Sequence, residues 1–314
     1  MQQYMAEFCK ECDYPTDAVV ELLETYQAAI SNDTTRKLLQ NNLQQMEENA
    51  FLYYAQELER LNCIAEELHV HPYTVHLLFF ILCARLARVR YEEKGIDLSI
   101  YHASMLDLKW KLMETKRVYG IWGVHCGDWF RPFFQAERFA LGRLQFEVVP
   151  SFTDYDNGKY VINKGDPVIN VHIPSSGPLE YKQVLDSYGM AADFFQTRFA
   201  GPIIPFQCDS WLLYPRVNKL LPEGNLRRFT ADFDVRLAGI DPRQDDRWRV
   251  FNVPNSTSIK EYEATTRLQK RLKKWLLEGN QMGIGLGYFF YGDNGILHHE
   301  LYSFSGNDTT IMLF

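Results

Sequence analysis

Two titratable side chains stand where they could carry a proton between reacting groups. His172 lies near the carboxyl end of the apolar run 168–173, and Glu147 lies on the polar side of the alternating run 141–148. An imidazole titrates near neutral pH, and partial burial raises the pKa of a carboxyl group toward neutrality. Each group can therefore act as a general base, and the sequence leaves the choice between them open.

A turn that could hold an anion follows His172 directly. Ser175, Ser176 and Gly177 come after the apolar run, and Pro178 is a residue favoured in the first turn of a helix. We therefore expect a helix from Pro178 to about Phe199. The start of a helix presents unpaired N–H groups and the positive end of its dipole. Ser175, Ser176 and Gly177 are thus candidate ligands for a phosphate group.

A second extended run, 203–213, brings further candidate groups. Ser210 could orient a substrate through its hydroxyl, and Tyr214 could donate a proton as an acid. Cys208 could be a nucleophile if His172 lay beside it, but a buried and inert cysteine is the favoured interpretation.

Other patterns are weaker. Gly283, Gly285 and Gly287 resemble part of a dinucleotide loop, but here a helix precedes and a strand follows, so close backbone approach is favoured. Cys9 and Cys12 have no second pair at metal-binding spacing, and we expect no metal site. The basic residues at 267–274 favour a solvated helix face, with a phosphorylated ligand or an acidic partner as the alternative.

The elements that position these residues fall into two domains. Apolar residues at helical spacing predict helices near 16–30, 34–48, 50–68, 72–94 and 99–117. After Trp129 the pattern changes to extended runs at 141–148, 168–173, 203–213, 226–237 and 283–291, of which 141–148 and 226–237 alternate, with helices at 178–199 and 259–277. The sequence therefore predicts an α+β protein, with a helical domain over 1–132 and a mixed β-sheet flanked by helices over 133–314.

Composition narrows the class of function. Acidic residues outnumber basic ones, 40 to 33, which gives a net charge of −7 and disfavours a nucleic-acid partner. The longest apolar block, 77–84, is too short to cross a bilayer, so we expect no membrane partner. Six scattered cysteines show no disulfide spacing, and the amino terminus shows no signal peptide. We therefore expect a cytoplasmic protein with reduced thiols.

Three segments carry a resemblance to a known family. They are Leu141–Phe146, then Val171–Pro174 with Gly177–Leu179, then Ser210–Leu213 with Leu220–Pro222. With these segments the chain resembles bacterial two-domain acyltransferase-domain proteins, which join a helical N-acyltransferase N-terminal domain to a GNAT-like C-terminal domain. The order of predicted elements agrees with that family over nearly the whole chain.

The resemblance implies an N-acyltransferase that uses acyl-CoA, acetyl-CoA or longer, as co-substrate. The acceptor would be an amine of a small molecule or a peptide, and acyl transfer would be direct. It also implies that Ser175, Ser176 and Gly177 bind the pyrophosphate of CoA. The glycine-rich loop common in GNAT proteins is absent here, so the alternative is a non-catalytic protein of the same fold that binds a ligand or partner. The oligomeric state is left open.

Overall fold

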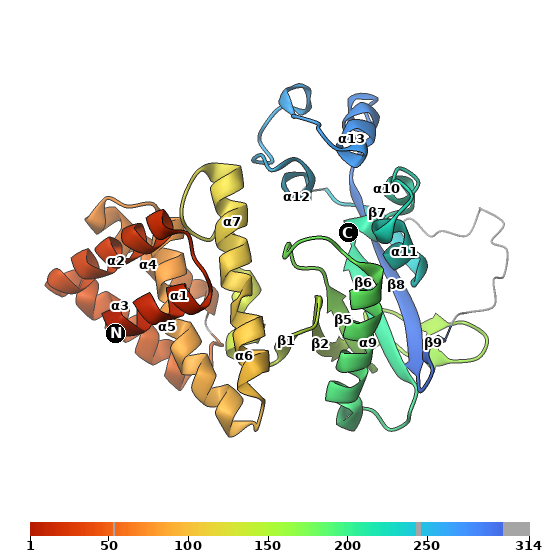
Figure 1. Cartoon of the computed structure of the whole chain (residues 1–314), viewed down its shortest axis with the longest axis horizontal. Coiled ribbons are helices and arrows are strands. Elements are labelled where there is room, and N and C mark those ends of the chain that lie inside the picture. Colours follow the sequence, from red (N-terminus) through yellow and green to blue (C-terminus); the bar gives the residue numbers. More distant parts are fainter. Residues whose placement is uncertain (53, 243–245, 298–314) are drawn as a thin grey trace. The chain divides into compact units, whose positions relative to one another are not determined.

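The structure is a computed structural model that describes residues 1–52, 54–242 and 246–297. The chain divides into two compact units, Met1–Ala140 and Leu141–Phe314. The first is drawn in red to yellow and the second in green to blue (Figure 1). Helices dominate the first unit and a mixed sheet flanked by helices dominates the second, so the predicted α+β class is confirmed.

The first unit is a bundle of helices. Its elements are α1 (Gln2–Glu11), α2 (Thr16–Ser31), α3 (Asp33–Glu48), α4 (Tyr54–Leu68), α5 (Pro72–Glu93), α6 (Leu98–Met105), α7 (Asp107–Tyr119), η1 (Gly127–Phe130) and α8 (Arg131–Phe134). Side chains of Asn32, His71 and Asp97 accept backbone N–H bonds at the starts of α3, α5 and α6. These caps explain why the helices begin where they do. The single helix predicted over 99–117 is two helices that meet at Leu106.

Helix α5 forms the core of this unit. In the part of the chain that the structure describes, α5 is the one helix long and apolar enough to cross a membrane by length and composition. A core helix meets the same criterion, and 61% of its most apolar window is buried inside the protein. Within the first unit it contacts α2, α3, α4, α6, α7 and α8. We therefore interpret its hydrophobicity as packing.

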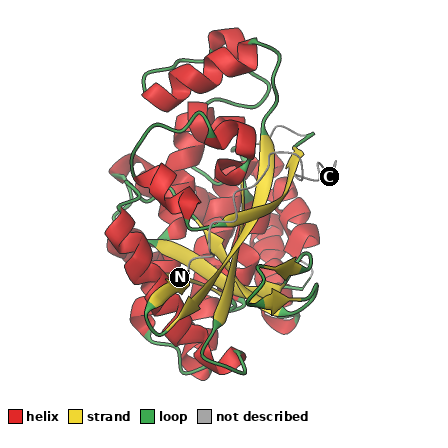
Figure 2. Cartoon of the chain, turned by 90° about the vertical axis from the view of Figure 1, so that its right-hand side faces the viewer, coloured by secondary structure: helices red, strands yellow, loops and turns green. Residues whose placement is uncertain are grey.

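The second unit is built on a mixed sheet with strand order β1-β2-β5-β6-β8-β7 and β9 paired to β8. Figure 2 draws the strands in yellow and the helices in red. The strands of the sheet are β1 (Arg138–Leu141), β2 (Leu144–Pro150), β5 (Pro167–His172), β6 (Ile204–Ser210), β7 (Asp234–Ile240), β8 (Gly283–Gly292) and β9 (Gly295–Leu297). A separate hairpin is formed by β3 (Tyr155–Asp156) and β4 (Val161–Ile162). The helices are α9 (Tyr181–Phe195), η2 (Gln196–Arg198), η3 (Trp211–Leu213), α10 (Pro215–Asn218), α11 (Asn225–Ala231), α12 (Arg247–Phe251), η4 (Ile259–Glu261) and α13 (Arg267–Leu277). Strands β5 and β6 are parallel, whereas β2–β5, β6–β8 and β7–β8 are antiparallel pairs.

The two faces of this sheet differ sharply. On one face Phe146, Phe206 and Phe289 pack around Tyr188 of α9. The other face carries polar residues in register across four strands, because Glu147 pairs with Asn170, Asn170 with Gln207, and Gln207 with Tyr288. Paired residues point to the same side of a sheet. A row of polar side chains therefore crosses the sheet on the face away from α9.

Several predicted elements in this unit differ from the structure, among them the helix predicted over 259–277, which is η4 and α13 with a loop between them. The run 141–148 is the end of β1 and most of β2, joined by a turn at Gly142, whose φ is +71°. The run 226–237 begins as helix α11 and becomes a strand only at Asp234. Phe229 and Thr230 are consecutive and both buried, which helix α11 allows and a strand with one solvated face would not.

Gly283, Gly285 and Gly287 lie in β8, as their strand interpretation predicted. A Cβ atom at Gly285 would lie 2.4 Å from the carbonyl oxygen of Leu213, and one at Gly283 would lie 2.7 Å from the ring of Tyr214. The glycines let η3 and Tyr214 pack directly on the strand. Their pattern thus reflects close packing and not a dinucleotide loop.

Candidate functional site

The site lies where β5 and β6 separate. These strands pair only at Ile169 with Phe206 and at Asn170 with Gln207, whereas β6 stays paired with β8 as far as Ser210. Beyond Asn170 and Gln207 the two parallel strands therefore diverge toward their carboxyl ends. We call this opening the fork. The sequence patterns predicted reacting groups near residues 171 and 208, and the structure makes these strands neighbours.

Glu147 and His172 meet beside the fork. Nε2 of His172 lies 2.7 Å from Oε1 of Glu147, and the two side chains are 18% and 12% exposed. A hydrogen bond this short between an imidazole nitrogen and a carboxylate is favourable when the nitrogen carries the proton. In the neutral ring the lone pair is then on Nδ1. Glu147 thereby fixes the tautomer of His172, as the carboxylate does in a carboxylate–histidine pair.

Asn170 is the third member of this group. Its Nδ2 lies 3.2 Å from Nε2 of His172, while its Oδ1 is buried without a hydrogen-bond partner among the described residues. Carboxamide oxygen and nitrogen atoms are assigned from their partners. With the proton of Nε2 directed to Glu147, the carboxamide oxygen of Asn170 is the better neighbour for Nε2. Asn170 and Glu147 therefore both hold the ring of His172.

Gln207 lies at the closed end of the fork. It is 0% exposed, and neither its Oε1 nor its Nε2 has a hydrogen-bond partner within the described part of the chain. Its neighbour in the row, Tyr288, is paired through its hydroxyl with Ser151 at 3.1 Å. Neither Asn170 nor Gln207 was among the residues predicted from the sequence. Their positions in the sequence could have indicated them. Asn170 is two residues before His172 and so points to the same face of the strand, and Gln207 is a polar residue within an apolar run.

Asp209 adds negative charge near the open end of β6. Desolvation of this carboxyl group and, to a smaller extent, the nearby carboxylate of Asp246 raise its pKa from 3.8 to about 6. The side chain itself is exposed, so solvent screening limits the energy that corresponds to this shift. Asp209 is thus a carboxyl group that changes charge just below neutral pH.

Ser210 and Tyr214 follow at the end of β6. Oγ of Ser210 accepts a hydrogen bond from the N–H of Leu212 at 3.3 Å and caps η3. The Tyr214 ring is 6% exposed and belongs to an apolar cluster with Val217, Phe251 and Leu272. The structure therefore brings Glu147 and His172 together, and gives Ser210 and Tyr214 packing and capping contacts. The predicted roles of Ser210 and Tyr214 in catalysis stay predictions.

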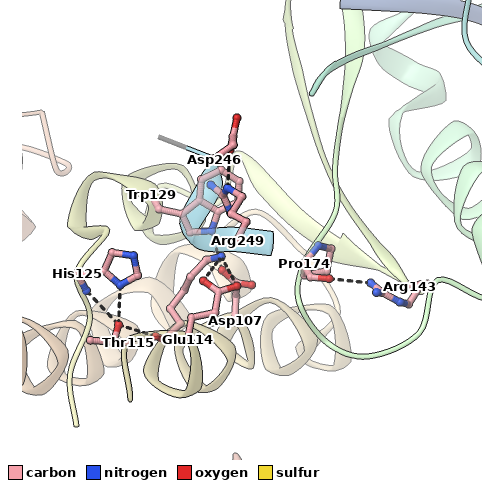
Figure 3. A network of polar contacts seen from close by, with 10 residues as sticks. Asp107, Glu114, Thr115, His125, Trp129, Arg143, Pro174, Asp246 and Arg249 are labelled. Atoms are coloured by element: carbon pink, nitrogen blue, oxygen red, sulfur yellow. Dashed lines mark hydrogen bonds and ion pairs between the residues drawn. The ribbon is translucent and has the colours of Figure 1, made fainter. Parts of the chain in front are cut away.

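The predicted helix start at Pro178 was wrong, because α9 begins at Tyr181. The guanidinium of Arg143 donates to the carbonyl oxygens of Pro174 at 3.1 Å, Gly177 at 2.6 Å and Pro178 at 2.9 Å. Figure 3 shows the contact with Pro174. These bonds hold residues 174–178 as a loop, with the Pro178 carbonyl directed to Arg143. Burial also lowers the pKa of Arg143.

This loop changes how Ser175, Ser176 and Gly177 could bind an anion. They precede α9 and are not in its first turn, so the helix dipole acts on them only weakly. Their backbone N–H groups donate to no protein group among the described residues, and Ser175 and Gly177 are exposed. These N–H groups can therefore still bind a phosphate. The donor set fits the CoA pyrophosphate as a loop and not as a helix N-terminus.

Cys208 does not lie beside His172. It neighbours Gln207 on β6, so it points to the opposite face of the sheet, where it is 1% exposed. Burial raises the pKa of this thiol, which keeps it protonated and unreactive. The thiol nucleophile considered for Cys208 is therefore excluded by the fold.

A second polar group lies in the helical unit and is drawn in Figure 3. Oγ1 of Thr115 lies 2.8 Å from Nδ1 of His125, and Nε1 of Trp129 donates to Asp107 at 2.6 Å. Lys111 pairs with Glu114 at 3.0 Å, so these two buried charges of α7 offset each other. The described residues include no group of His, Cys, Asp and Glu side chains that could hold a metal ion.

Comparison with solved structures gives the same fold. An acyltransferase in complex with decanoyl-CoA and teicoplanin matches with a TM-score of 0.69 and 18% identity over 90% of this chain and 86% of that one. An acyltransferase in complex with CoA and 10C-teicoplanin matches with a TM-score of 0.70 and 18% identity over the same shares. An acyltransferase in complex with decanoyl-CoA matches with a TM-score of 0.67 and 19% identity, again over 90% and 86%. A search of curated proteins found no match.

Family models account for most of the sequence. The model of the N-acyltransferase N-terminal domain matches residues 3–136, and the model of the GNAT-like C-terminal domain matches residues 139–289. These ranges correspond to the helical unit and to the sheet with its helices. The chain therefore belongs to the two-domain proteins that join an N-acyltransferase N-terminal domain to a GNAT-like C-terminal domain.

Proposed function

We propose that this protein is an acyl-CoA-dependent N-acyltransferase that transfers the acyl group directly to an amine. The observation that carries the proposal is the Glu147–His172 hydrogen bond at the fork of β5 and β6. The family and the fold support an acyl-CoA donor. The pair supplies the general base that attack by an amine requires.

In the proposed reaction the amine nitrogen attacks the carbonyl carbon of the thioester. The C–N bond forms, the C=O electron pair moves to oxygen, and His172 takes the amine proton on Nδ1. Glu147 stabilises the imidazolium that results, because its carboxylate already accepts the Nε2–H bond. When the C=O bond re-forms, the C–S bond breaks and CoA leaves as a thiolate, which then takes up a proton.

The other predicted residues have places in this scheme. Ser175, Ser176 and Gly177 would bind the pyrophosphate through backbone N–H groups, and Tyr214 would protonate the leaving thiolate. Ser210 would support the end of β6 by capping η3. Asp209, near the open end of the fork, favours a cationic approaching group while it is ionised. That charge supports an amine acceptor, either a peptide or a small molecule, and solved relatives bind a glycopeptide, teicoplanin.

The first test is binding followed by transfer. Titration calorimetry with acetyl-CoA and decanoyl-CoA should detect one site per chain, and mass spectrometry should detect an acylated product when a panel of peptide amines is added. Failure of both thioesters to bind would refute the proposal. Binding with no transfer to any acceptor would favour the alternative, a non-catalytic ligand-binding protein of this fold.

A further inference from the structure

The side chain of Gln207 presents an unusual combination of burial and lack of partners. A carboxamide can donate two hydrogen bonds and accept two. Gln207 is 0% exposed and makes none with any described residue, through Oε1 or through Nε2. Leaving such a group unpaired in a protein interior costs about 1–3 kcal/mol. A leucine or methionine of similar size would avoid this cost, so the carboxamide needs an explanation beyond packing.

Its position indicates what that explanation is. Gln207 and Asn170 are the last paired residues before β5 and β6 diverge, so they form the floor of the fork. Neighbouring strands lie about 4.8 Å apart, and the side chains of paired residues point to the same face. Asn170 in turn lies 3.2 Å from His172. The unpaired carboxamide therefore lies one strand away from the residues that hold the proposed base.

We propose that Nε2 of Gln207 donates a hydrogen bond to the carbonyl oxygen of the acyl thioester and stabilises the negative charge that develops there. This inference rests on the proposed function. A group buried away from bulk water is suited to this task, because a donor fixed before the reaction stabilises an oxyanion strongly. Gln207 would thus be a further catalytic residue. The acceptor in the new bond is the oxygen whose electron pair comes from the C=O bond as the amine attacks.

The neighbouring groups agree with this assignment. The hydroxyl of Tyr288, on the other side of Gln207, is paired with Ser151, and the carboxylate of Glu147 has no proton to donate, so neither is set up to donate to the thioester. The carboxamide of Asn170 is engaged at one end by Nε2 of His172. In this row Gln207 is the residue whose carboxamide is buried with both ends unpaired among the described residues.

The central experiment uses Gln207→Met in the full-length protein, because methionine keeps the size and removes both polar atoms. The variant should unfold about 2–4 °C above the natural protein, since an unpaired buried group is replaced by an apolar one. Asn42→Leu is the matched control. Its buried carboxamide does have a partner, the Glu57 carbonyl at 3.3 Å, so this substitution should lower the melting temperature.

Turnover should change in the opposite direction to stability. We expect Gln207→Met to lower kcat about 10²–10³-fold, the usual effect of removing one oxyanion donor, with the Kd for decanoyl-CoA changed less than about threefold. A melting temperature that falls, or a kcat within about threefold of the natural protein, would overturn the assignment. The opposite signs separate this role from a structural one.

A second readout does not depend on turnover. Infrared spectra of decanoyl-CoA labelled with carbon-13 at the thioester carbonyl should show a band at lower frequency when it is bound to the natural protein than when it is bound to Gln207→Met. If decanoyl-CoA and acetyl-CoA both fail to bind, the proposed function has failed. If decanoyl-CoA binds and the band is the same in both proteins, the proposed function stands and the role of Gln207 is wrong.

Discussion

At the scale of single residues, the proposed chemistry depends on how one imidazole is held. The carboxylate of Glu147 accepts a hydrogen bond from Nε2–H of His172. Asn170, two residues before His172 on the same strand, lies 3.2 Å from the same nitrogen. These contacts leave Nδ1 as the basic atom of the neutral ring. The sequence left open whether Glu147 or His172 is the base. In our proposal His172 accepts the proton, and Glu147 orients the imidazole ring of His172.

The thiols provide a direct check of which face of the sheet each residue occupies. Cys208 is buried beneath α9 with its pKa raised, whereas Cys63 is exposed. We expect iodoacetamide to label Cys63 readily and Cys208 only after unfolding, as followed by peptide mass spectrometry. Labelling of Cys208 below neutral pH at a rate equal to that of Cys63 would contradict this orientation.

At the scale of elements, a buried carboxyl group links α9 to the residue after α11. The hydroxyl of Tyr181 donates to Oδ1 of Asp232 at 2.6 Å, and that of Tyr188 lies 3.4 Å from Oδ2. Burial raises the pKa of Asp232 from 3.8 to about 6 in the folded protein, despite these hydrogen bonds. The folded state therefore keeps a proton that the unfolded state loses above about pH 4.

This linkage predicts how stability changes with pH. The contribution of Asp232 is fully present below about pH 4 and is lost as pH rises through about 6. Asp232→Asn cannot ionise, so above pH 6 it should be more stable than the natural protein by about 1–3 kcal/mol, with the difference vanishing near pH 4. Urea unfolding at several pH values measures this. Asp209 titrates in both proteins, so the difference between them isolates Asp232, and a pH-independent difference would refute the linkage.

The loop before α9 should depend on Arg143. Arg143→Met removes donors to the carbonyl groups of Pro174, Gly177 and Pro178, and we expect a loss of about 1–2 kcal/mol in the free energy of unfolding. Amide hydrogen exchange should accelerate at 174–180. Lys182→Met is the control, because its bond to Asp186 is exposed and such pairs contribute little. Equal exchange in both variants would show that Arg143 does not hold the loop.

The packing of η3 against β8 is tested at Gly285. A Cβ there would meet the backbone of Leu213 at 2.4 Å, so Gly285→Ala should lower the free energy of unfolding by about 1–3 kcal/mol. Gly201→Ala is the control, since apart from its chain neighbours no described residue has a heavy atom within 4 Å of the position that its methyl group would take. Chemical denaturation of both variants provides the comparison. If Gly285→Ala were as stable as Gly201→Ala, close packing would not explain the glycines of β8.

Local patterns were enough to predict part of this architecture. Alternation placed Glu147 on a polar face, the apolar run 168–173 placed His172 near the end of a strand, and helical spacing located α2, α3 and α5 to within a few residues. Contacts distant in sequence were not predictable in the same way. The bonds from Arg143 to the loop decide where α9 begins, and the pairing of β5 with β6 decides that Gln207 joins Asn170. No local periodicity encodes either contact.

At the scale of the whole molecule, two family domains occur in one chain. In the helical unit the other helices pack around α5, and the sheet unit contains the fork with its row of polar residues. Solved acyltransferase structures of similar fold hold decanoyl-CoA or CoA. The panel of peptide amines described above is the way to identify the acceptor.

The most direct test of the central claim is acyl transfer by the full chain with and without its proposed base. With saturating decanoyl-CoA and an acceptor that the natural protein acylates, we expect His172→Gln to lower kcat about 10²–10⁴-fold, because a positioned base contributes that much. Glu147→Gln should also lower kcat, while the Kd for decanoyl-CoA stays within about threefold in both variants. Transfer at the natural rate by His172→Gln would contradict the proposed mechanism.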